Sequence, residues 1–209
     1  KWEMKLYYSL FNTEIAILRG SHIGNLTDLE DAIERDVPFF TEDKFSYDIN
    51  EPRQTVQHHL LKLESKHIFN EHQSLKLTYG GQVNNRKEFD VRRADRSDLP
   101  ALSLLQWDQY LEGIYNHFFD HDCQLKTGIQ LRLTDNTNNP ETGILPLIPD
   151  YRAYKLGAFA IFQEEHKKIL YELGARYDMN HLQVVTISQS LPREIERFYH
   201  TFHNYSLSS

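Results

Sequence analysis

The chain has 209 residues, of which 40% are hydrophobic and 25% are charged; this is ordinary globular usage and argues against disorder. Its formal net charge of -7 excludes a uniformly basic nucleic-acid coat. Its single cysteine, Cys123, excludes an internal disulfide and a cysteine-cluster metal site. There is no apolar run of the roughly 18 residues that a membrane-spanning helix needs, and no signal-peptide pattern. These features predict a soluble, cytoplasmic protein that contacts no membrane.

Residues 1–86 are predicted to form a small, mainly helical domain. Helices are expected where apolar residues recur near a helical period, over 6–18 and after Pro52. Thr27, with Glu30 three residues later, has the capping-box pattern of a further helix start, and the alternation over 74–79 predicts a strand. The polar stretch from Gly80 to Arg86 is rich in turn-forming residues and predicts a domain boundary. A hairpin loop inside a single domain is the alternative.

Residues 87–209 are predicted to alternate strands with helices. The expected strands are 89–93, 128–134, 143–148 and 181–187. The expected helices are 102–119, 156–173 and 192–202, the middle one ending at Gly174. This order predicts an α/β fold in which helices flank a mixed sheet.

The stretch from Leu147 to Ala158 is the most informative for function. The pattern predicts the end of a strand, a short loop with Arg152 and Lys155, and the start of a long helix. Such a loop directs backbone N–H groups and the positive end of a helix dipole at one point, where phosphate binds. Gly157 would let a ligand approach the backbone. The alternative is an ordinary turn with a solvated arginine and lysine.

Four motifs occur in a recognisable order over about residues 88–205. They are a strand and helix entry at 91–102, the loop at 149–158, Leu-Gly-Ala at 173–175 before a strand, and Phe198-Tyr199 on an expected helix. Together they resemble the GNAT family of acyl-CoA-dependent N-acyltransferases. The resemblance implies a GNAT-like domain over 87–209 that transfers an acetyl group to an amine acceptor by direct attack on the thioester of acetyl-CoA.

The resemblance also implies roles for individual residues. Acetyl-CoA, as co-substrate, would contact residues of the loop and of the strand before it: Leu147, Ile148, Arg152, Lys155, Leu156, Gly157 and Ala158. Tyr199 would protonate the leaving thiolate. The base that takes the amine proton stays open among Asp135, Glu141 and His121. Because Pro146 and Lys155 depart from the family pattern, an acyl-CoA-sensing regulator and a non-catalytic interaction module remain alternatives.

The N-terminal domain has a resemblance of its own. The apolar pattern over 26–33, followed by the stretch 53–64, is similar to a winged helix-turn-helix. This implies DNA contacts from the start of a recognition helix, through Arg53, Gln54, Gln57 and His58. The segment 1–86 carries 10 Lys/Arg against 13 Asp/Glu, however, which opposes phosphate contacts. A structural, substrate-shaping or dimerisation role is the alternative, and it leaves a homodimer open.

The eleven histidines raise the question of a metal site. His117 and His121 are four residues apart, which on a helix can form a two-ligand face. No third ligand is apparent and no glutamate stands in the general-base place of the zinc-protease motif. The sequence therefore predicts a solvated helix end and no metal.

Overall fold

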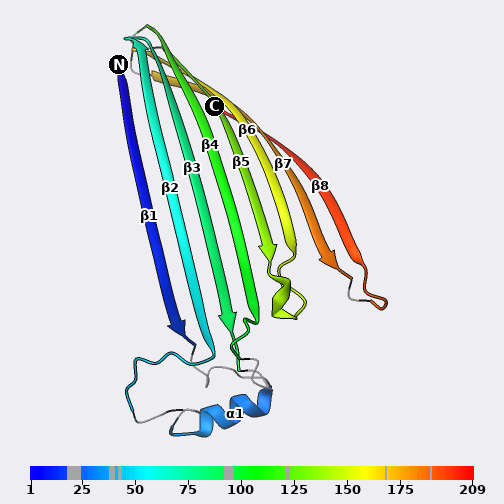
Figure 1. Cartoon of the computed structure of the whole chain (residues 1–209). Helices are drawn as coiled ribbons and strands as arrows, with labels where there is room; N and C mark the ends of the chain where they lie inside the picture. The colour runs from blue at the N-terminus through cyan, green and yellow to red at the C-terminus, as the bar shows by residue number, and fades with distance from the viewer. Residues whose placement is uncertain are drawn as a thin grey trace.

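The computed structural model describes residues 1–17, 25–37, 41, 44–91, 97–120, 123–167, 169–188 and 190–209. In this part of the chain, eight long strands form one sheet (Figure 1). They are β1 (Trp2–Ala16), β2 (Arg53–Asn70), β3 (Gln73–Phe89), β4 (Leu102–Asp120), β5 (Cys123–Asn138), β6 (Asp150–His166), β7 (Ile169–Ile187) and β8 (Ile195–Ser208). Two helical elements are described, α1 (Leu26–Glu34) and the short 3-10 helix η2 (Pro140–Thr142).

The sheet is an antiparallel meander in which each strand pairs with the next one along the chain. The strands lie side by side in a single layer, and α1 lies beyond one end of the strands rather than on a face (Figure 1). β2 to β7 are paired on both sides, whereas β1 and β8 each have one partner strand. Both edges of the sheet therefore present backbone groups that the sheet itself does not pair.

The strand register sorts the side chains onto two faces, because alternate residues of a strand point to opposite sides and paired residues point to the same side. One cross-strand row consists of Leu6, Leu63, Tyr79, Leu111, Leu131, Leu156, Met179 and His203. We call the side that carries this row the apolar face. The neighbouring row, on the opposite side, consists of Lys5, Glu64, Thr78, Glu112, Gln130, Gly157, Asp178 and Asn204. We call that side the polar face.

The predicted α/β fold with a helical, winged-helix-like N-terminal domain is wrong. The structure is an all-antiparallel sheet with one short α-helix in the described residues. The helix expected over 102–119 is part of β4. Most of the one over 192–202 lies in β8, and the one over 156–173 covers the rest of β6 and the start of β7. Long strands with apolar side chains on both faces produced the apparent helical spacing. Leu6 and Leu10 lie on the apolar face of β1, but Ile15 lies on the polar face.

Some local predictions are confirmed. The strands expected over 74–79, 128–134 and 181–187 lie within β3, β5 and β7. A helix follows the predicted start signal, but its N-cap is Asn25 and not Thr27: the Asn25 side chain accepts a hydrogen bond from the Asp28 N–H at 2.9 Å. The strand expected over 143–148 is wrong, because this segment lies between η2 and β6. Leu18 of the expected helix over 6–18, residues 92–96 of the expected helix entry, and His121 lie outside the described residues.

The expected boundary between residues 86 and 87 lies inside β3. Gly80 and Gly81, which the sequence analysis assigned to a turn-rich stretch, are in the middle of this strand and pair with β2 and β4. Gly81 has a packing role instead. A Cβ at that position would lie 2.9 Å from the Tyr79 hydroxyl oxygen, so the Tyr79 side chain occupies the space that a larger residue would need.

Candidate functional site

The sheet exposes far more surface than a folded chain of its size normally does. A chain of 24.8 kDa has an expected accessible surface of about 10,200 Å², whereas this one exposes 15823 Å². Ala153 is the only buried hydrophobic residue among those described. Because domains are normally built from at least two packed layers, one face of this sheet lacks its covering layer.

The apolar face carries an uninterrupted band without charged residues. Four consecutive cross-strand rows contain no Asp, Glu, Lys or Arg. Their members are every second residue, counted from the first, of the ranges 2–8, 61–67, 75–81, 109–115, 127–133, 154–160, 175–181 and 201–207. The large side chains in this band are open to the surroundings, with Leu6 72% and Ile129 56% exposed. This uncharged surface is mainly apolar, although it includes polar side chains such as Gln109, His181 and Thr201. It extends across eight strands and is much larger than the apolar patches found on ordinary soluble monomers.

Aromatic side chains occur in every row of this band, with Tyr177 in the second row and Tyr79 in the third. Trp2 and Tyr115 belong to its first row, whereas Tyr8 and Tyr154 belong to its last. Trp107 is in the row beyond Tyr8. Charges begin in that same row, where the Arg152 Nε donates to an Asp135 carboxylate oxygen at 2.7 Å. Tryptophan and tyrosine suit such a boundary because one end of each side chain is apolar and the other can hydrogen-bond.

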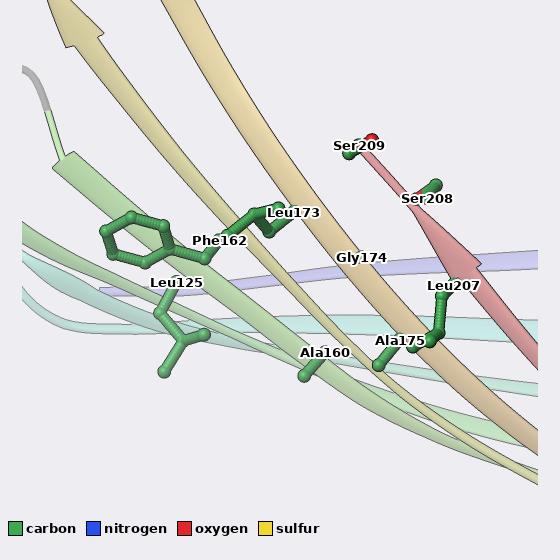
Figure 2. A pocket seen from close by; sticks show the side chains of 9 residues that line it. All are labelled: Leu125, Ala160, Phe162, Leu173, Gly174, Ala175, Leu207, Ser208 and Ser209. Carbon is green, nitrogen blue, oxygen red and sulfur yellow. The ribbon is translucent and has the colours of Figure 1, made fainter.

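The apolar face also contains a shallow hollow of about 490 Å³ near the C-terminal end of β8 (Figure 2). Leu125, Phe162 and Leu173 stand along one side of it, and Leu207 lies on the other. The small side chains of Ala160 and Ala175, on the adjacent β6 and β7, leave the space between them. Six of the nine lining residues are aliphatic or aromatic, and Gly174, Ser208 and Ser209 complete the lining, so the hollow suits a hydrocarbon chain better than a polar ligand.

The polar face carries a hydrogen-bonded network at the level of the apolar band. The Arg176 Nη2 donates to the Gln130 Oε1 at 2.7 Å, and the Gln130 Nε2 donates to the Glu112 Oε2 at 2.6 Å. The Tyr110 hydroxyl donates to the same Glu112 oxygen at 2.7 Å, while Arg176 also forms an ion pair with Asp178. The network spans β4 to β7 and satisfies its polar groups within the sheet.

The network changes the protonation of its members. Partial burial and the hydrogen bond to Glu112 raise the pKa of Tyr110 to about 12. Burial alone would raise the pKa of Glu112, but the hydrogen bonds from Tyr110 and Gln130 outweigh it and hold that pKa below its ordinary value. The hydrogen bond from Arg176 likewise lowers the pKa of Asp178. The carboxylates of Glu112 and Asp178 are therefore ionised at neutral pH.

A second ionic group lies beside this network. The Arg132 Nε donates to both carboxylate oxygens of Asp108, at 3.1 and 2.8 Å, and the Thr134 hydroxyl donates to Asp108 at 2.6 Å. The Asp108 side chain is 8% exposed, whereas that of Arg132 is 49% exposed. A nearly buried carboxylate thus has three donor contacts, and the arginine extends from it toward solvent.

The residues predicted to bind acetyl-CoA do not form a loop at a helix start. Arg152 to Ala158 lie in β6 and pair with β5 on one side and β7 on the other. Their backbone N–H groups therefore serve the strand ladder instead of pointing together at a phosphate. Lys155 and Gly157 belong to the polar face, whereas Arg152, Leu156 and Ala158 belong to the apolar face. Leu147 and Ile148 precede the strand.

Some of the predicted catalytic residues do come together. Tyr199, Arg152 and Asp135 line one hollow of about 340 Å³ at the charged end of the apolar band. Tyr199 belongs to the edge strand β8 and is 61% exposed. The side chain of Glu141, another candidate base, is outside the described part of the structure. The acetyltransferase activity and acetyl-CoA stay predictions from the sequence.

The residues predicted to contact DNA lie at the start of β2. Arg53 and Gln57 lie on the side of the apolar face, whereas Gln54 and His58 lie on that of the polar face. Arg53 forms an ion pair with Glu14 at 2.5 Å. The four side chains thus do not share one surface, as they would on a recognition helix. DNA binding stays a prediction.

Sequence reasoning missed the apolar face itself. The signal was present as alternation, most clearly at Trp2, Met4, Leu6, Tyr8 and Leu10. In the part of the chain that the structure describes, no helix has the length and apolar character needed to cross a membrane. No protein-family model, curated protein or solved structure matches the chain.

Proposed function

We propose that this chain is a membrane-inserted sheet whose apolar face contacts lipid acyl chains and whose polar face borders water. The observation that carries the proposal is the contrast between the two faces at the same level of the sheet. One face has four rows without a charge, and the other holds Glu112, Arg132 and Arg176. A charged side chain on a lipid-facing strand surface costs up to about 2–4 kcal/mol at the bilayer midplane.

The height of the apolar band supports lipid as the occupant. The row beyond Trp2 contains Gln73, His117, Leu125, Phe162 and Leu173 and also lacks charge. With this row the band covers about nine residues of a strand, close to the 9–11 residues with which a tilted strand crosses the hydrocarbon core. Trp2 and Trp107 lie toward its two ends, as tryptophans do in the aromatic belts at membrane–water interfaces, whereas tyrosines lie both toward the ends and within the band.

The two edge strands set a condition on this function. Unpaired backbone N–H and C=O groups cost several kcal/mol each in hydrocarbon. β1 and β8 each have one partner in the sheet. Inside a bilayer, both edges must therefore pair with further strands, which would bury the backbone groups that are open here.

The two tryptophans test the proposal without any mutation, since both lie on the apolar face, Trp2 64% and Trp107 49% exposed. The full chain is reconstituted into phosphatidylcholine vesicles, and tryptophan fluorescence is measured with lipids brominated near the headgroup or near the bilayer midplane. We expect strong quenching, greater for bromine near the headgroup because both residues lie at ends of the band. A stable water-soluble assembly that ignores vesicles, with unquenched tryptophans, would instead mean that a second protein layer covers the face.

A further inference from the structure

The polar face holds an unfavourable charge arrangement near the hairpin between β2 and β3. In the register, Lys66 of β2 lies between Lys76 of β3 and Glu3 of β1 on the same face, so it directly opposes one like charge and one carboxylate. Like charges directly opposite each other destabilise an antiparallel strand pair. A bound anion between the two ammonium groups would turn this repulsion into attraction.

The two lysines belong to a larger basic hollow of about 450 Å³. Its charged lining residues are Glu3, Lys5, Glu64, Lys66, Lys76 and Lys126, contributed by β1, β2, β3 and β5. Four ammonium groups thus face two carboxylates. This local excess of positive charge contrasts with the formal net charge of -7 of the whole chain.

The two carboxylates are already engaged by lysines. Glu64 lies 2.7 Å from the Nζ of Lys62 and 3.7 Å from that of Lys76, and Glu3 lies 2.8 Å from the Nζ of Lys1. The hydrogen bond from Lys62 and the charge of Lys76 lower the pKa of Glu64. Lysines outside the lining therefore neutralise the carboxylates further, and the excess positive charge in the hollow remains.

We propose that this hollow binds a multivalent oxyanion that carries phosphate or sulfate groups. Several ammonium groups around one space suit an anion with more than one charge, because each acts as a mobile point charge with three donors. The proposal needs only that the polar face is in water. It is thus independent of whether lipid or protein covers the apolar face.

The test uses inorganic tripolyphosphate as the probe and the full chain in a nonionic detergent. Isothermal titration calorimetry is expected to show binding that weakens as sodium chloride is added. The double variant Lys66→Gln/Lys76→Gln should bind at least tenfold more weakly. Lys87→Gln, at the far end of β3, is the matched control and should bind like the parent chain.

Thermal unfolding gives a second readout that a merely structural role would not produce. The double variant without anion is the reference, because it loses the repulsion between Lys66 and Lys76 together with the attraction of these lysines to Glu3 and Glu64. Tripolyphosphate should raise the unfolding temperature of the parent but not that of the double variant. Absence of binding by the parent at low salt, or equal binding by the double variant, would overturn the proposal.

A lipid headgroup is the other source of the same chemistry. Adding phosphatidylglycerol to the micelles distinguishes it from a free anion, with phosphatidylcholine as the control. If phosphatidylglycerol weakens the binding of tripolyphosphate and phosphatidylcholine does not, the oxyanion site is supported and its ligand is a lipid headgroup. No competition, with tripolyphosphate still bound, would assign it to a dissolved anion.

Discussion

Arg176 of β7 reaches across β6 and donates a hydrogen bond to Gln130 of β5 at 2.7 Å, passing over Gly157. A Cβ at Gly157 would lie 2.8 Å from both the Arg176 Nη2 and the Asp178 Oδ1. The contact between two strands that do not pair is therefore possible because the strand between them has no side chain at this point. The network on the polar face depends on this glycine.

Replacing Gly157 with alanine should break the network. The new methyl group would lie too close to the Arg176 Nη2 and the Asp178 Oδ1, so these side chains must move. When Arg176 moves, the Gln130 Oε1 loses its hydrogen-bond donor. We expect a loss of about 0.5–1.5 kcal/mol in the free energy of unfolding, because the displaced atoms are the ends of flexible side chains and one hydrogen bond is lost; it is measured as a lower urea midpoint in detergent.

Gly80→Ala is the control for this variant. Gly80 lies on the same face, and the nearest atom to its added Cβ is the Tyr110 Cβ at 3.9 Å. This substitution should leave stability unchanged or raise it slightly, since alanine loses less backbone entropy than glycine on folding. An equal loss for both variants would show that the space above Gly157 has no special role.

The Glu112→Gln variant should reduce the acid sensitivity of the protein. Hydrogen bonds lower the pKa of Glu112 in the folded state. Its contribution to stability is thus present above the ordinary glutamate pKa and is lost as the pH falls through the lowered value. Unfolding temperatures measured between pH 7 and pH 3 should fall less steeply for Glu112→Gln than for the parent. Glu30→Gln on α1 is the control, and a parallel decline in all three chains would contradict the assignment.

Acetyl-CoA tests the acyltransferase hypothesis directly. The backbone of Arg152 to Ala158 is paired on both sides, so it has no set of free N–H groups to offer a pyrophosphate. We therefore expect acetyl-CoA to leave the unfolding temperature unchanged, with free CoA and ATP as controls. A rise specific to acetyl-CoA, lost in Arg152→Ala, would restore that hypothesis.

The sequence predicted local strands better than the fold. Residues 74–79 and 128–134 alternate cleanly, 181–187 is rich in β-branched residues, and all three segments lie in strands. In β1 the alternation on the apolar face was obscured, because Tyr7, Phe11 and Ile15 are large and apolar on the opposite face. Leu6 and Leu10, four residues apart, fit a helix as well as a strand, and the choice between them depends on pairing partners far away in the sequence.

The hydrogen-bonded network and the basic hollow on the polar face could not be predicted from the sequence for the same reason. Arg176 and Gln130 are 46 residues apart, and Lys66 opposes Lys76 only because the hairpin between them fixes the register. The local pattern around Arg152 and Gly157 fitted a phosphate loop only if a helix followed. In the sheet, Gly157 instead makes room for the side chains of neighbouring strands.

The most direct test of a lipid-facing surface compares two adjacent residues of β1. Tyr7 and Tyr8 are the same residue type, 55% and 58% exposed, but Tyr7 lies on the polar face and Tyr8 on the apolar face. Each is replaced by tryptophan in a chain carrying Trp2→Phe and Trp107→Phe, and quenching by brominated lipid is measured in vesicles. We expect strong quenching of Tyr8→Trp and little of Tyr7→Trp. Equal quenching of the two, or none of Tyr8→Trp, would contradict the assignment of the apolar face to lipid.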